Sequence, residues 1–226
     1  MRNLLLVLAS MREASTYDLA SGFLAADQPR AREAALVAAS RIDGPRAEPE
    51  LVSALGDRSV SVPVRAVEEL GAMGSSDPAF LAFLLELFEG KLQARVNAAA
   101  QKGTTRQFAI ELSEHYRLLL AGCAAVANLA RRGGLDLSEL EPPVMRSLKK
   151  LDGTLVGLAQ RVLGKGAELD RIEEQRIAVA LGLITTLAWI GTPACLPVLR
   201  DLGKHAVPRV ASLAERAIEK ITARIG

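Results

Sequence analysis

Four side chains of this sequence belong to the types that carry nucleophilic chemistry. They are the two cysteines, Cys123 and Cys195, and the two histidines, His115 and His205. An imidazole activates a thiol only within hydrogen-bonding reach, and His115 precedes Cys123 by two helical turns on one face. Both cysteines stand in apolar helical surroundings without metal-ligand spacing, so we expect buried free thiols in a reducing cytoplasm.

The motifs of cofactor and metal chemistry are also missing. The sequence contains no phosphate-binding loop of the form G-x-x-x-x-G-K-[ST] and no repeated His-Glu pairs. We therefore expect no catalytic residue, no metal and no cofactor. Trp189 is the only tryptophan and precedes a helix stop, so we expect a packing residue rather than a recognition platform.

Composition favours closely packed helices. Of the 226 residues, 50% are hydrophobic and only 4% are aromatic, and few segments alternate with the period of a strand. No stretch approaches the roughly 18 apolar residues that a membrane span needs. The first residues, MRNLLLVLASMREAS, resemble a minimal signal sequence, but Leu4, Leu8 and Met11 form a helical stripe. We expect a cytoplasmic protein, with export as the alternative; arginine outnumbers lysine, which hints at a bacterial source.

The clearest organised stretch covers residues 54–74, ALGDRSVSVPVRAVEELGAMG. Gly56 offers a left-handed stop to a short first helix, and Asp57 or Ser59 offers a cap to a second. An apolar stripe at helical spacing follows, formed by Val62, Ala66, Val67 and Leu70. Such a helix-turn-helix unit buries its apolar face only against stacked neighbours.

This stretch resembles a HEAT repeat of the bilin-lyase type, whose pattern is A-L-G-D, a Val-Arg pair, an Ala-rich helix and L-G-x-I-G. The residues that match in register are Ala54-Leu55-Gly56-Asp57, Val62, Ala66, Leu70-Gly71 and Met73-Gly74. Pro63 stands where the family usually carries arginine. The series of Asp–Arg contacts that joins successive repeats in the family is therefore not predicted for this chain. The runs ITTLAWIGTPACLPVLRDL and AIEKI near the C-terminus resemble the same pattern.

Helix signals continue on both sides of this unit. We expect helices over residues 3–13 and 15–26, and a third that Asp27 caps. One long helix is expected from Thr104 or Thr105 to Arg132, unless Gly122 breaks it. Further helices are expected over 144–162, where leucines and valines step by four and three, and from Asp170 to the C-terminus, interrupted at Gly191-Thr192-Pro193.

These elements together predict an all-α fold. We expect a right-handed α-solenoid of about five HEAT-like helix pairs with an irregular middle, in a single repeat domain over residues 1–226. The regular repeats are expected at about 15–103 and 170–226, and the irregular helices at 104–169.

Charge is distributed unevenly although the net charge is only +2. Residues 41–89 hold 4 basic and 9 acidic side chains, and residues 91–165 hold 12 basic and 6 acidic ones. In a solenoid, sequence position maps onto distance along the array, so the sequence predicts an acidic and a basic region. Solvated helix faces are the simpler alternative.

Two functions follow from this reading. The first is a non-enzymatic scaffold that binds another protein, a role that the family resemblance implies. The residues expected to bind the partner are Arg65 and Glu69 on the second-helix row, and Arg131, Arg132, Arg146, Lys149, Lys150, Arg161 and Lys165 in the basic region.

The alternative is a nucleic-acid-binding protein that uses the basic region for phosphate contacts. DNA glycosylases built from HEAT-like repeats are similar in length, but they use tryptophans and an acidic residue in a basic cleft, and this chain has a single tryptophan. A bilin-lyase activity would rest on the name of the repeat type and on no residue of this sequence.

Overall fold

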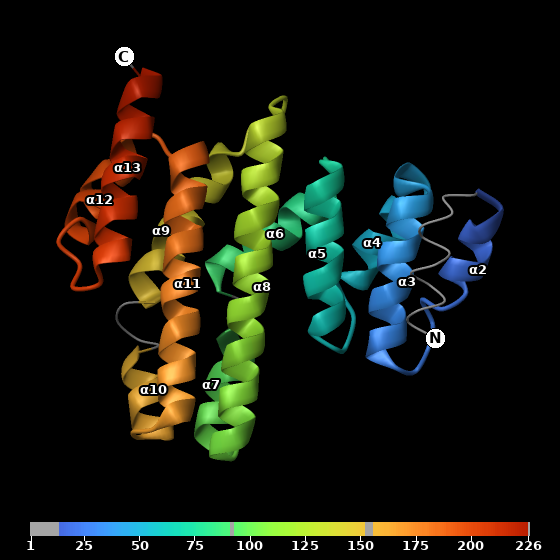
Figure 1. Ribbon diagram of the computed structural model, residues 1–226, viewed down its shortest axis with the longest axis horizontal. Helices are drawn as coiled ribbons and strands as arrows, with labels where there is room; N and C mark the ends of the chain where they lie inside the picture. Colours follow the sequence, from blue (N-terminus) through green and yellow to red (C-terminus); the bar gives the residue numbers. More distant parts are fainter. Residues whose placement is uncertain (1–13, 91–92, 152–155, 226) are drawn as a thin grey trace. The chain divides into compact units, whose positions relative to one another are not determined.

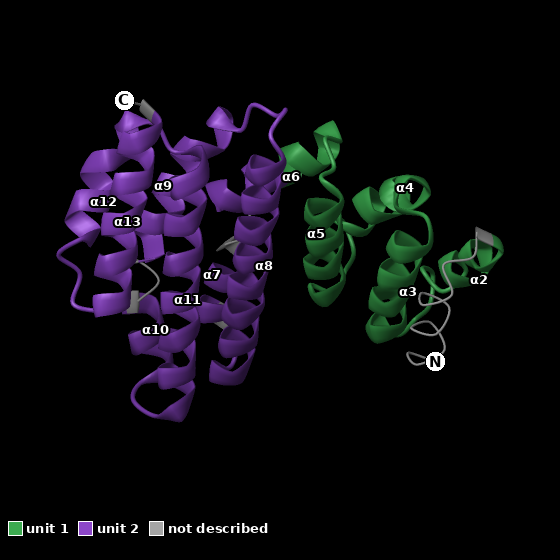
Figure 2. Ribbon diagram, turned by 45° about the horizontal axis from the view of Figure 1, so that its top comes forward, with its two compact units in different colours: residues 1–83 green, residues 84–226 purple. Residues whose placement is uncertain are grey.

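The computed structural model describes residues 14–90, 93–151 and 156–225, and it divides into two compact units (Figure 1, Figure 2). Unit 1 is Met1–Phe83 and unit 2 is Leu84–Gly226. The described residues contain helices and no strand, which confirms the all-α prediction. The expected helix over 3–13 lies outside the described residues.

Unit 1 consists of two helix pairs and the start of a further helix. Its elements are η1 (Ala14–Thr16), α2 (Tyr17–Ser21), α3 (Pro29–Ile42), α4 (Gly44–Ala54), α5 (Ser61–Met73) and the first half of α6 (Pro78–Glu89). Alanine side chains of α3 pack against Ala20 of α2, with Phe23 and Leu24 over them. Because these side chains are small, the helices approach closely.

Four local predictions in unit 1 are wrong. The residue before α5 is Val60 rather than Asp57 or Ser59, and no side chain caps that helix. Helix α2 ends at Ser21 instead of residue 26, since Gly22 and a series of turns follow it. The residue before α3 is Gln28 rather than Asp27, and Pro29 opens the helix without a side-chain cap. Gly56 is not left-handed: the amides of residues 55–57 bond to carbonyls three residues earlier, which tightens the last turn of α4 and closes it.

An arginine–aspartate pair joins the two repeats of unit 1. Arg32 of α3 donates from Nε and Nη2 to the two carboxylate oxygens of Asp57, both at 2.8 Å. Its Nη1 donates to the carbonyls of Ala26 and Asp27. The Asp–Arg contact between repeats, which the proline at position 63 put in question, is therefore present between these two repeats. Its arginine, Arg32, comes from the preceding repeat.

Unit 2 contains the second half of α6 and the remaining helices. These are α7 (Gln93–Lys102), α8 (Thr105–Arg132), η2 (Ser138–Leu140), α9 (Glu141–Lys150), α10 (Val156–Leu163), α11 (Ala167–Ile190), η4 (Pro193–Cys195), α12 (Leu196–Leu202) and α13 (Pro208–Ile225). The second helices α3, α5, α8, α11 and α13 give five helix pairs over the described residues, as expected. The stripe over 144–162 spans α9 and α10, and residues 152–155 between them are not described.

Helix α8 is the long helix expected between residues 104 and 132. Thr104 caps it by accepting a hydrogen bond from the amide of Gln107, and it continues unbroken through Gly122. That glycine lies against other side chains, since a Cβ there would stand 2.7 Å from Leu87 and 3.2 Å from Phe88. Gly122 therefore permits close packing rather than breaking the helix.

Helices α8, α11 and α13 run parallel and side by side, with α11 in the middle (Figure 1). Ser113 near the start of α8 contacts Arg171 of α11, and Cys123 lies against Gly182, where a Cβ would stand 3.3 Å from the cysteine. Near the far ends, the ring of Trp189 lies beneath Lys220 of α13. Unit 2 thus presents a face made of three parallel second helices.

Candidate functional site

The two binding residues expected in unit 1 lie on α5 and already have partners there. Arg65 forms an ion pair with Glu68, 2.6 Å from Nη1 to Oε2. Glu69 accepts a hydrogen bond from Ser40 of α3, and burial raises the pKa of its carboxyl group. Glu69 therefore links two second helices, and Arg65 is the more accessible of the two residues.

The seven basic residues expected in the middle of the chain lie in three places. Arg131 and Arg132 end α8, Arg161 and Lys165 lie at the end of α10, and the other three are on α9. Helix α11 runs about 36 Å at 1.5 Å per residue, from Ala167 beside Lys165 to Trp189 beside Arg131. A basic segment of sequence does not form one basic surface here.

On α9, two of the expected residues stabilise the end of α6. Lys150 donates from Nζ to the backbone carbonyl of Glu89 at 3.3 Å, and Arg146 lies 3.7 Å from the carboxylate of Glu89. Ser147 donates to the carbonyl of Phe88. These contacts satisfy carbonyls that a helix end leaves free. Lys149 is exposed, and among the described residues it makes no contact of this kind with the end of α6.

Trp189 has a more specific environment than packing alone. Nζ of Lys220 lies 2.9 Å from the ring centroid and the guanidinium of Arg131 lies 6.0 Å from it. Arg224 donates to the carbonyls of Trp189 and Gly191. Burial lowers the pKa of Lys220, and the neighbouring Arg224 and Arg131 lower it further. The ends of the three parallel helices therefore carry a cluster of cations around one aromatic ring.

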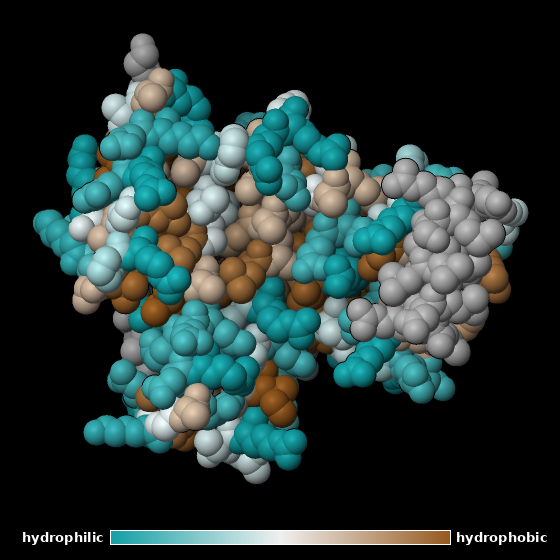
Figure 3. Space-filling model, in the orientation of Figure 1, coloured by the Kyte–Doolittle hydropathy of each residue, from teal (hydrophilic) through white to brown (hydrophobic). Residues whose placement is uncertain are grey.

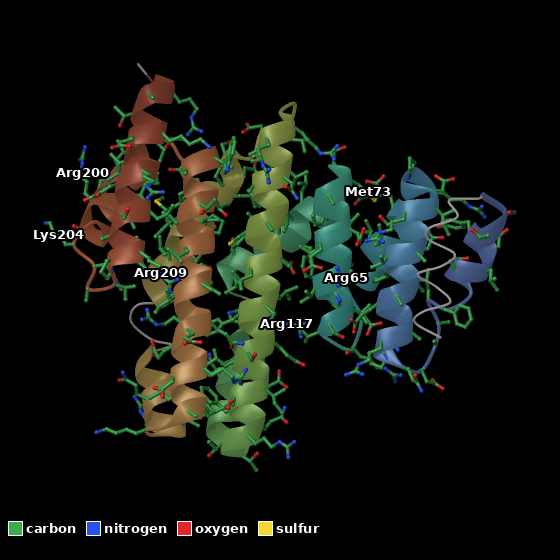
Figure 4. All side chains as sticks on the ribbon, in the orientation of Figure 1. Arg65, Met73, Arg117, Arg200, Lys204 and Arg209 are labelled. Atoms are coloured by element: carbon green, nitrogen blue, oxygen red, sulfur yellow. The ribbon has the colours of Figure 1, made fainter. Side chains whose placement is uncertain are left out.

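Further cations on this face were not singled out from the sequence. Arg117 of α8 and Arg209 of α13 are exposed on either side of α11 (Figure 4). Neither has an ion-pair or hydrogen-bond partner among the described residues. Arg216 follows Arg209 by two turns of α13. The signal that could have found them is the uncharged stretch Ile177–Ile190 in the helix between them.

A hollow of about 400 Å³ opens between α11 and α13. Its lining residues are Leu181 from α11 and Pro208, Arg209, Ser212, Leu213 and Arg216 from α13. In Figure 3, brown and pale residues gather over the upper part of α11 and its border with α13, beside teal ones. The hollow is therefore apolar at its floor and cationic at its rim.

The two thiols are unsuited to nucleophilic catalysis. Burial raises the pKa of Cys123 to about 12, and burial together with the nearby Glu141 raises that of Cys195 to about 11. Burial, with a smaller effect of Lys150, lowers the pKa of His115 to about 4. A thiol activated by an imidazole has the opposite properties.

The described residues offer neither a metal-binding cluster nor a helix fit to span a membrane. In the part of the chain that the structure describes, no group of three or more His, Cys, Asp and Glu side chains is placed to hold a metal ion. No helix there combines the length and the apolar character that crossing a bilayer requires.

Comparison with known proteins gives one match. Residues 17–103, which comprise α2 to α7, match the family model for HEAT repeats. No curated protein and no solved structure matches the chain.

Proposed function

Since its residues 17–103 make this chain a HEAT-repeat protein, we propose that it is a non-enzymatic scaffold or adaptor that binds another protein in the cytoplasm. The observation that carries the proposal is the face of three parallel helices, α8, α11 and α13. Stacked second helices offer an extended, preformed surface, which is the physical basis of partner binding by solenoids. Preformed surfaces also lose little conformational entropy on binding.

The chemistry of the thiols supports the non-enzymatic and cytoplasmic parts of the proposal. Neither Cys123 nor Cys195 is a thiolate at neutral pH, because burial raises the pKa of both. Both are free and buried, as expected for a protein that folds in a reducing compartment.

The nucleic-acid alternative has less support. It depended on a basic surface formed by residues 91–165, and the seven basic residues named from that segment lie in three places. Single strands are usually held by stacking on several aromatic rings, whereas the one tryptophan here is covered by Lys220.

The proposal is tested by capture of partners with the full chain from nuclease-treated lysate of the source organism, followed by cross-linking mass spectrometry. We expect a protein that cross-links to second helices, and loss of this partner in surface variants with unchanged unfolding. Arg65→Ala probes α5, and Lys149→Glu probes α9 without removing a contact to Glu89. Retention only when nuclease is omitted would instead favour nucleic-acid binding.

A further inference from the structure

We propose that unit 2 binds an acidic, amphipathic α-helix of a partner protein along α11, an inference that rests on the proposed function and specifies the partner. The surface concerned is called the α11 trough. Its floor is Ile177–Ile190, and its rim consists of Arg117, Arg131, Arg209, Arg216 and Lys220.

The floor of the trough is uncharged. Over fourteen positions, IAVALGLITTLAWI, it contains no ionisable side chain. The half-buried residues on its open side are Ala178, Leu181, Thr185 and Ala188. Because these side chains are short and the flanking ones are arginine and lysine, longer cationic side chains border the open side of the middle helix.

On α8, the edge of the trough is cationic. Arg117 and Arg131 lie on the exposed side of α8, about four helical turns apart. With about 100° per residue, Glu114 is turned about 100° around α8 from Ser113, whose hydroxyl contacts α11. Glu114 therefore lies off the flank of α8 that contacts α11.

On α13, the edge of the trough is also cationic. Arg209 and Arg216 line the hollow with Leu181, and Lys220 covers the ring of Trp189. By helical spacing, Glu219 lies two turns after Ser212 on the outer face of α13, whereas Glu215 lies on the flank toward α12, beside Gly203. Both edges thus present cations toward an apolar floor.

The dimensions of the trough fit a helix. Neighbouring helix axes lie about 8–10 Å apart, so α8 and α13 stand about 16–20 Å apart across α11. A helix with its side chains is about 10–12 Å wide, and carboxylates on its two flanks reach both edges. The floor accommodates about 14 residues, or roughly 20 Å of helix.

Acidic residues mark one end of the floor. Glu174 and Asp170 lie one turn or more before Ala178 on the exposed part of α11. Acidic side chains of a partner helix would be repelled by these two carboxylates. The docked helix is therefore confined to the part of α11 that the five cations flank.

The experiment measures binding of the full chain to stapled, dye-labelled helical peptides of about 14 residues by fluorescence anisotropy. The probe carries a leucine stripe and glutamates on both flanks, and a matched peptide carries glutamine instead. A labelled oligothymidine is the third probe. The variant is Arg117→Glu/Arg209→Glu, and its matched control is Arg200→Glu/Lys204→Glu, which reverses two exposed cations outside the trough (Figure 4).

We expect the acidic peptide to bind at least tenfold tighter than the glutamine peptide, with affinity falling as salt rises. The Arg117→Glu/Arg209→Glu variant should lose at least tenfold and the control less than twofold. Equal loss in both variants, equal binding of both peptides, or binding of oligothymidine alone would overturn the proposal. If these fail while the lysate experiment still yields a protein cross-linked elsewhere, the proposed function stands and only the trough assignment falls.

Discussion

The pair Arg32–Asp57 is the contact between repeats whose removal we expect to cost most in unit 1. The side chains are only 7% and 16% exposed, and two N–H···O bonds of 2.8 Å join them. Removing one partner of a buried ion pair costs about 3–5 kcal/mol, because the remaining charge stays buried. Water reaches Asp57 in part, so we expect Asp57→Asn to lower the free energy of unfolding by about 3 kcal/mol.

The arginine should be the more sensitive half of the pair. Besides Asp57, its Nη1 serves the carbonyls of Ala26 and Asp27, which Arg32→Met would leave without this donor. The double variant should cost less than the sum of the two single ones by about 2 kcal/mol, because each single change already breaks the shared contact.

Urea unfolding followed by circular dichroism, with hydrogen exchange of peptides from residues 29–73, reports on this contact. Trp189 lies in unit 2, so its fluorescence is not the readout. The control is Asp18→Asn, which breaks the ion pair to Arg46, where the two side chains are 77% and 48% exposed. Exposed pairs contribute less than about 1 kcal/mol. An Asp57→Asn variant as stable as this control would refute the reasoning.

The pair also has a predicted pH dependence. Hydrogen bonds from Arg32 are the main reason that the pKa of Asp57 lies below its ordinary value of 3.8. The folded-state pKa is thus lower than the unfolded one. The stability that the pair contributes is present above pH about 4 and is lost as pH falls through the folded pKa; Asp57→Asn should lack this component.

Two further predictions concern unit 2. Burial lowers the pKa of His115 from 6.5 to about 4, so protonation of the unfolded chain should reduce stability by about 2 kcal/mol between pH 7 and pH 5; His115→Leu should remove this part of the slope in urea titrations, and an unchanged slope would contradict the burial argument. Gly122→Ala places a Cβ 2.7 Å from buried Leu87 and should lower the unfolding free energy by about 1–3 kcal/mol. The exposed Gly157 has open space around its Cβ, so Gly157→Ala should cause no such loss, and equal effects of the two substitutions would discount overpacking.

Local features of this protein are readable from its sequence where they depend on near neighbours. Thr104 caps α8 as expected, and Gly133 and Gly134 follow the end of that helix with positive φ angles. Thr192 caps the turn before α12, as its place between Gly191 and Pro193 indicates. Each of these depends on backbone preferences and on hydrogen bonds spanning a few residues.

The candidate site was readable only in part. Arg131 was named from the sequence and lies at the edge of the trough, whereas Arg117 and Arg209 were not named. A run of basic residues along a helix distributes over all of its sides, since successive positions turn by about 100°. Counting charges along the chain therefore predicted a basic surface that the helices divide among three places.

The sequence by itself determined the helices, some of their ends and the repeat type, because these follow from local propensity and hydrophobic period. Tertiary structure alone decided which side chains meet. Arg32 reaches Asp57 and Lys220 reaches Trp189 because parallel helices stack in a fixed register. That register is set by close approaches such as Gly182 against Cys123, and packing of this kind depends on the shapes of both surfaces, which no single segment specifies.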